Sequence, residues 1–123
     1  MKEIGKVFPS NEFTVSVKED DTYGGAHYYE FNNCLGFNNG VTEYTDGKQA
    51  IQFIKKEEDG SMTAGIQSEQ LLIALIDRHK KLNDKFSSRE GALAITKMEE
   101  ALHWLEARVK ERIDRGVMGE LKK

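Results

Sequence analysis

The chain has one cysteine, one proline and no long hydrophobic run in 123 residues. Cys34 alone cannot form an internal disulfide, so nothing in the sequence indicates an oxidising compartment. The longest purely apolar run, residues 71–76, is far too short to cross a bilayer. Charged residues also occupy the place where an N-terminal signal peptide would need its apolar core. We therefore expect a cytoplasmic protein without a membrane partner.

The chain also lacks an excess of positive charge, because it has 18 Lys and Arg and 21 Asp and Glu, which gives a net charge of −3. A binder of long nucleic acid is usually basic, so that class is disfavoured. The charge is uneven: residues 1–65 hold 6 Lys and Arg against 11 Asp and Glu, and residues 66–123 hold 12 against 10. The cationic groups gather in the second half, which favours a small anionic ligand.

Sequence motifs of metal sites, phosphate loops and catalytic sites are missing too. The three histidines, His27, His79 and His103, lack the spacing of metal ligands. The sequence around Gly47-Lys48 fails the phosphate-loop pattern, because Thr42 stands where its first glycine would be. No nucleophile with a base and an acid can be chosen. We therefore predict no catalytic residue, no metal and no cofactor, and we expect a protein that is not an enzyme.

Hydrophobic periodicity divides the chain into a strand-rich part, residues 1–65, and a helical part, residues 66–123, which we expect to form a single domain over 1–123. Apolar residues alternate with polar ones in the first part, and Asn39-Gly40 is a hairpin turn signal. Helical spacing and S-x-x-E capping at Ser87 mark two helices in the second part. The expected strands are 12–18, 27–33 and 49–56, and the expected helices are 68–86 and 87–115. The fold class is α+β, a small antiparallel sheet followed by a two-helix hairpin.

The last helix carries an unusual row of side chains. Trp104, Arg108, Arg112 and Arg115 are three or four residues apart, so they line one ridge beside the apolar face. Arginine guanidinium groups bind phosphate well, and an indole ring offers a stacking surface for a base. A solvated helix face or an oligomer interface would use the same residues, so both alternatives stay open.

Three segments resemble the phage-encoded Thoeris anti-defence proteins: YYEFNNCLGFNNG, QAIQFIKKEEDG, and GIQSEQLLIALIDRHKKLNDKFSSRE with the closing ERIDRGVMGELKK. The resemblance implies a sponge in the host bacterial cytoplasm. Such proteins sequester cyclic ADP-ribose isomers, which bacterial TIR-domain proteins make as an alarm signal, without degrading them. It also implies a homo-oligomer, a dimer or higher, in which the sheet half and helical half of partner chains enclose the ligand. Some members hold cyclic trinucleotides at a second site.

The chemistry of such a ligand assigns roles to candidate residues. Phosphates would meet Arg78, Arg108, Arg112 and Arg115; adenine would stack on Trp104 or Phe37; ribose hydroxyls would meet His27, Asn33 or Asn38. Three charge-assisted contacts and one stack, at about 2 kcal/mol each, leave only millimolar affinity after the cost of association. The ridge alone is therefore insufficient. Two alternatives remain, a hydrolase of the same signal and a non-catalytic homo-oligomeric interaction protein.

Overall fold

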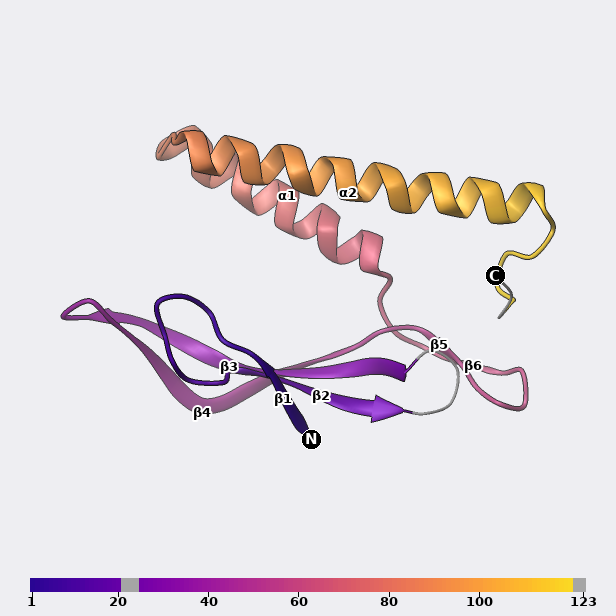
Figure 1. The fold of residues 1–123 in the computed structure, drawn as a ribbon, viewed down its shortest axis with the longest axis horizontal. Helices are drawn as coiled ribbons and strands as arrows, with labels where there is room; N and C mark the ends of the chain where they lie inside the picture. Colours follow the sequence, from indigo (N-terminus) through magenta and orange to yellow (C-terminus); the bar gives the residue numbers. More distant parts are fainter. Residues whose placement is uncertain (21–24, 121–123) are drawn as a thin grey trace. The chain divides into compact units, whose positions relative to one another are not determined.

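The computed structural model describes residues 1–20 and 25–120 and shows an antiparallel sheet followed by two helices (Figure 1). The expected α+β fold class is confirmed. The chain forms two compact units, Met1–Ile66 and Gln67–Lys123, which are described separately below. The boundary between them falls one residue from the expected change between strand-rich and helical sequence.

The first unit contains a four-stranded antiparallel sheet in the order β1-β2-β3-β4. A separate two-stranded ribbon, β5-β6, follows it. The bounds are β1 Lys2–Gly5, β2 Val15–Asp20, β3 Gly25–Asn38, β4 Val41–Gln52, β5 Lys55–Lys56 and β6 Met62–Thr63. The expected strand over 49–56 is wrong in its bounds, because β4 begins eight residues earlier and ends before Phe53. Polar residues fill that early part of β4, so alternation could not reveal it.

The long β3–β4 hairpin turns at Asn39 and Gly40, which have φ values of 53° and 77°. Positive φ at both positions matches the twist of paired strands, and Asn-Gly adopts it at low cost. The turn predicted there is confirmed. β2 pairs with β3 as far as Phe31, so the part of the hairpin near its turn extends beyond β2.

Few side chains hold the sheet unit together. Val17 is 4% exposed, and Tyr29 packs edge-to-face on Phe53 with ring centres 5.7 Å apart. The Lys55 ammonium donates to Asp20 Oδ2 at 2.5 Å, and this contact joins β5 to the end of β2. The hydrogen bond to Asp20 is the main cause that raises the pKa of Lys55.

The second unit is a helical hairpin made of α1, Ser68–Lys85, and α2, Arg89–Asp114. Ser88 is the N-cap of α2 and accepts from the Gly91 N–H at 2.9 Å, so the cap lies one residue after the Ser87 that the sequence pattern indicated. Gly116, with φ of 73°, ends α2 in the way expected of a C-terminal glycine. Neither helix is long and apolar enough to span a membrane.

The two helices pack through Ile76 and Ile95, each 8% exposed. Lys80 and Glu99 add an ion pair of 3.4 Å across the contact. α2 has eight residues more than α1, an excess of about 12 Å at 1.5 Å per residue. The connection between α1 and α2 is short, so this excess extends the end of α2 past the start of α1. We call the last eight residues of α2, 107–114, the overhang.

Replacing Ser88 with Ala should lower the free energy of unfolding by about 1 kcal/mol, because the cap of α2 loses its acceptor. Ser88→Asp keeps an acceptor and should retain most of the stability. Chemical denaturation followed by circular dichroism measures both variants. Equal stability of Ser88→Ala and the parent chain would contradict the capping role.

Candidate functional site

The exposed row on α2 is the first part of the candidate site. Trp104 is 73% exposed, and its ring lies edge-on to His103 with centres 6.2 Å apart. Arg108 is exposed one turn further along the helix and forms no ion pair within the residues that the structure describes. An unpaired guanidinium beside an indole can bind a phosphate and stack a base at the same time.

Arg112 has a different position from the one that the sequence suggests. Its side chain is 6% exposed, and its guanidinium donates to the backbone oxygens of Val117, at 3.1 Å, and Glu120. The group therefore fastens the chain that follows α2 onto the helix. Its phosphate-binding role stays a prediction, but a ligand would have to compete with these carbonyls.

The remaining arginines differ in what surrounds them. Arg115 is exposed and donates to the Glu111 carboxylate, with Nη2 and Oε2 at 3.2 Å. Arg78 is exposed on α1, so it lies on the other helix of the hairpin. Of the four predicted phosphate ligands, Arg108 and Arg112 lie on α2, Arg115 is its C-cap and Arg78 lies on α1. Arg78 and Arg108 are exposed and form no ion pair within the residues that the structure describes.

The predicted ribose ligands lie on β3 in the sheet unit. Asn33 accepts from Gln49 Nε2 at 2.8 Å, and Asn38 precedes the hairpin turn. His27 lies near the start of the same strand, about 30 Å from Phe37 at 3.3 Å per residue. A single small nucleotide cannot span that distance, so His27 and the hairpin residues are not brought together within one chain.

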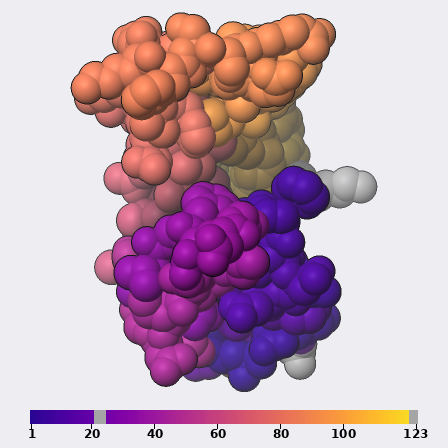
Figure 2. All heavy atoms as spheres, turned by 90° about the vertical axis from the view of Figure 1, so that its left-hand side faces the viewer, coloured from indigo at the N-terminus to yellow at the C-terminus, as the bar shows by residue number. Residues whose placement is uncertain are grey.

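Phe37 lines an apolar cavity of about 250 Å³ on the sheet unit. The segment joining β1 to β2 and the β3–β4 hairpin lie side by side there (Figures 1 and 2). Phe31 and Tyr44 also line the cavity, and so does Thr42, whose Oγ1 is buried without a hydrogen-bond partner among the described residues. A ligand hydroxyl or amine could supply that partner. Sequence reasoning missed Thr42, because nothing in the alternation of β4 marks it.

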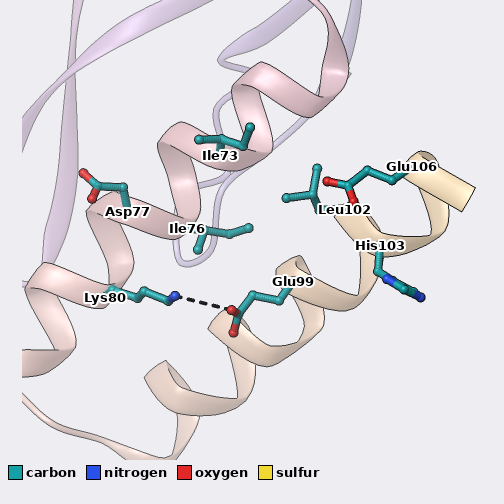
Figure 3. Close-up of a pocket in the computed structure, with 8 residues that line it drawn as sticks. All are labelled: Ile73, Ile76, Asp77, Lys80, Glu99, Leu102, His103 and Glu106. Atoms are coloured by element: carbon teal, nitrogen blue, oxygen red, sulfur yellow. Dashed lines mark ion pairs between the residues drawn. The ribbon is translucent and has the colours of Figure 1, made fainter. Parts of the chain in front are cut away.

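A second hollow, about 450 Å³, lies between α1 and α2 (Figure 3). Ile73 and Ile76 from α1 and Leu102 from α2 point into it, and Lys80 and Glu99 point toward one another at its side. We call this hollow the hairpin groove. Apolar spacing predicted the helices, but the way they separate, and hence the groove, was not visible in the sequence.

A tyrosine next to one of the candidate residues has a shifted pKa. The Tyr28 hydroxyl, next to His27, donates to Glu30 Oε2 at 2.9 Å, and this bond raises the pKa of Tyr28. Residues 1–20 and 25–120 contain no group of three or more His, Cys, Asp or Glu that could hold a metal ion. The helical unit thus presents cationic and aromatic groups, and the sheet unit presents aromatic and amide groups.

Comparison with known proteins decides the family. Residues 45–110 match the family model of the Acb2/Tad1 hairpin domain, which is more than half of the chain. The chain belongs to the Acb2/Tad1 family. A 56-residue segment is 48% identical to Thoeris anti-defense 1 from Bacillus phage SBSphiJ7, and this segment is 45% of the chain and 39% of that relative. The resemblance to the phage Thoeris anti-defence proteins is confirmed.

The Acb2/Tad1 match covers the end of β4, the β5–β6 ribbon, α1 and most of α2. Arg78, Trp104 and Arg108 therefore lie inside the family's hairpin domain, and Arg112 and Arg115 follow it. His27, Asn33, Phe37 and Asn38 precede the matched range. The candidate residues thus divide between the family's shared domain and the sheet before it.

Arg112→Leu should lower the free energy of unfolding of the hairpin unit by about 1–3 kcal/mol, because the carbonyls of Val117 and Glu120 lose the charged donor that the buried Arg112 supplies. Amide exchange at Val117, whose N–H donates to the Arg112 carbonyl, should become faster. Arg108→Leu removes an exposed guanidinium and should change stability by less than about 0.5 kcal/mol. Thermal unfolding and hydrogen exchange compare the two variants. Similar behaviour of both would refute the structural role of Arg112.

Proposed function

We propose that this chain is a phage anti-defence protein that binds a cyclic ADP-ribose isomer and withholds it from the host. The signal is one made by bacterial TIR-domain proteins, and the protein acts in the host cytoplasm without degrading its ligand. The observation that carries the proposal is the membership of the Acb2/Tad1 family, together with the free Arg108 fork beside the exposed Trp104.

The helical residues alone do not bind tightly enough. With Arg112 engaged by carbonyls and Arg115 by Glu111, Arg108 and one stack contribute about 4 kcal/mol, which only offsets the cost of association. A sponge needs nanomolar affinity, about −12 kcal/mol. Further contacts must come from the sheet unit of a second copy.

The cavity beside Phe37 is suited to the adenine. Aromatic rings of Phe31, Phe37 and Tyr44 surround it, and Thr42 Oγ1 lacks a partner there among the described residues. Burial between rings shields a base from water better than the open helix surface around Trp104 does. Phe37 therefore takes the stacking role on the sheet side. Asn33 and Asn38, on the same strand, remain the candidates for the ribose hydroxyls. A homo-oligomer supplies both sets of residues to one ligand.

Arg108→Ala should weaken binding about 30-fold, the loss of roughly 2 kcal/mol from one charge-assisted contact. Phe37→Ala should weaken it about tenfold or more through lost stacking. Arg89→Ala, an exposed arginine at the start of α2, is the matched control and should bind like the parent chain. Calorimetry with a purified cyclic ADP-ribose isomer measures all four proteins, and equal affinities would contradict the assigned site.

Identifying the compound that the heated protein releases distinguishes a sponge from a hydrolase and from a pure interaction protein. The protein is incubated with the product of a TIR-domain enzyme, freed of unbound ligand and denatured, and the released compound is identified by mass spectrometry. A sponge returns the intact isomer, whereas a hydrolase returns a linear or cleaved product. No released nucleotide would favour a pure interaction protein. A parallel incubation with cyclic trinucleotides tests for the second ligand class.

A further inference from the structure

The cavity beside Phe37 has one face of the sheet as its floor. Its lining includes three pairs of facing residues on neighbouring strands: Val15 with Phe31, Cys34 with Tyr44, and Phe37 with Thr42. Directly opposite residues of an antiparallel pair project to the same side of the sheet, so each pair presents both side chains to one face. Because all three pairs line one cavity, they share that face. The floor therefore carries three aromatic rings.

The loop that joins β1 to β2 forms a further wall of this cavity, through Val7 and Phe8. The Thr14 N–H donates to the Gly5 carbonyl at 3.2 Å and closes the base of the loop. Nearer the tip, the Ser10 N–H donates to the Val7 carbonyl at 2.8 Å, which fixes a turn with Phe8 at its second position. The backbone that carries the Phe8 ring is thus held by hydrogen bonds at the base and at the tip of the loop.

Phe8 is 93% exposed, although it lines a cavity. Val7 and Phe37, which border the same cavity, are 54% and 72% exposed. A single apolar side chain in solvent is normal on a protein surface, whereas a group of them around one hollow indicates a binding surface. Most of the Phe8 ring is therefore open to a flat apolar ligand that enters the cavity.

The lining of the cavity selects the class of ligand. None of the described residues around it is charged, so a phosphate would lose its hydration there without gaining a counter-charge. The volume of about 250 Å³ is below the roughly 300–1,000 Å³ of sites for drug-sized ligands, so one ring system fits rather than a whole nucleotide. Thr42 Oγ1, which lacks a hydrogen-bond partner among the described residues, can donate to or accept from a polar atom of that ring. A neutral, planar heterocycle meets these three conditions.

We propose that Phe8 is a base-binding residue, which stacks on a neutral nucleobase in this cavity and closes the cavity from the side of the β1–β2 loop. The inference rests on the proposed function, which supplies the class of ligand, and it adds a residue that lies on neither a strand nor a helix. Aromatic side chains bind bases because every base has a π face. The phosphates of the same ligand would remain outside the uncharged cavity.

Leu35 offers a matched control for Phe8. It is 71% exposed on β3, directly after Cys34, and it does not line the cavity. Truncating Phe8 or Leu35 removes an exposed apolar side chain and leaves no buried void, so both variants should stay folded. Circular dichroism checks this.

The test uses adenosine as the probe, because adenosine carries a base and no phosphate. In NMR titrations of the purified chain, the amide chemical shifts of Phe37 and Thr42 report occupancy of the cavity. Phe8→Ala should raise the dissociation constant for adenosine about tenfold, equivalent to about 1.4 kcal/mol, because the stack is lost. Phe8→Tyr keeps the ring and should stay within about threefold of the parent, whereas Phe8→Leu keeps only apolar bulk and should bind about fivefold more weakly. Leu35→Ala should bind like the parent chain.

Inorganic pyrophosphate is the second probe, and it should leave the Phe37 and Thr42 amides unshifted because the lining is uncharged. Four results would each overturn the base-binding role of Phe8: adenosine that shifts neither amide, parent-like binding by Phe8→Ala, equal affinities of Phe8→Tyr and Phe8→Leu, or pyrophosphate that shifts both amides.

Calorimetry with a purified cyclic ADP-ribose isomer tests the proposed function separately. If adenosine shifts the cavity amides but the isomer is not captured, the proposed function fails and the role of Phe8 stands. If the isomer is captured without shifts at Phe37 and Thr42, the role of Phe8 fails and the proposed function stands.

Discussion

The antiparallel contact of α1 with α2 is the interaction on which the rest of the functional geometry depends. Ile76 and Ile95 are buried in it, and the Lys80–Glu99 pair crosses it. This contact decides which side of α2 meets α1, and so it decides that Trp104 and Arg108 face outward. It also leaves the groove between the separating helices and the overhang of α2. A change in this packing would alter the hairpin groove and the surroundings of Trp104 and Arg108 together.

The arginines show how surroundings change the role of one side chain. Arg108, Arg112 and Arg115 have the same chemistry and nearly the same spacing, yet their partners differ. Arg108 has no ion pair among the described residues, Arg112 binds the carbonyls of Val117 and Glu120, and Arg115 is paired with Glu111. The affinity for the proposed nucleotide must therefore come from fewer guanidinium groups than the sequence contains. This shortage explains why the sheet unit, with its apolar cavity at Phe37 and the unpaired Thr42 hydroxyl, matters to the proposed capture of a cyclic nucleotide.

Little apolar surface is buried within one chain, since Val17, Ile76 and Ile95 are the buried hydrophobic residues among those described. The exposed Phe37 and Trp104 are suited to a ligand, whereas Ile73 and Ile113 are suited to a protein surface. Membership of the Acb2/Tad1 family supports the proposed role in phage anti-defence.

The sequence alone determined the α+β class, the Asn39-Gly40 turn, the two helices and the glycine that ends α2, because each depends on local propensity or periodicity. It also placed Trp104 and Arg108 on one helical row, since spacing fixes a face. It missed β1, the early part of β4 and the buried place of Arg112, which depend on pairing and packing between distant residues. Whether His27 and Phe37 share a site was likewise undecidable locally, because strand length and bulges set their separation. Only the tertiary structure decided which guanidinium groups lack a partner among the described residues and where the two helices separate. The reason is that the burial of a side chain depends on the residues packed around it and not on its own type.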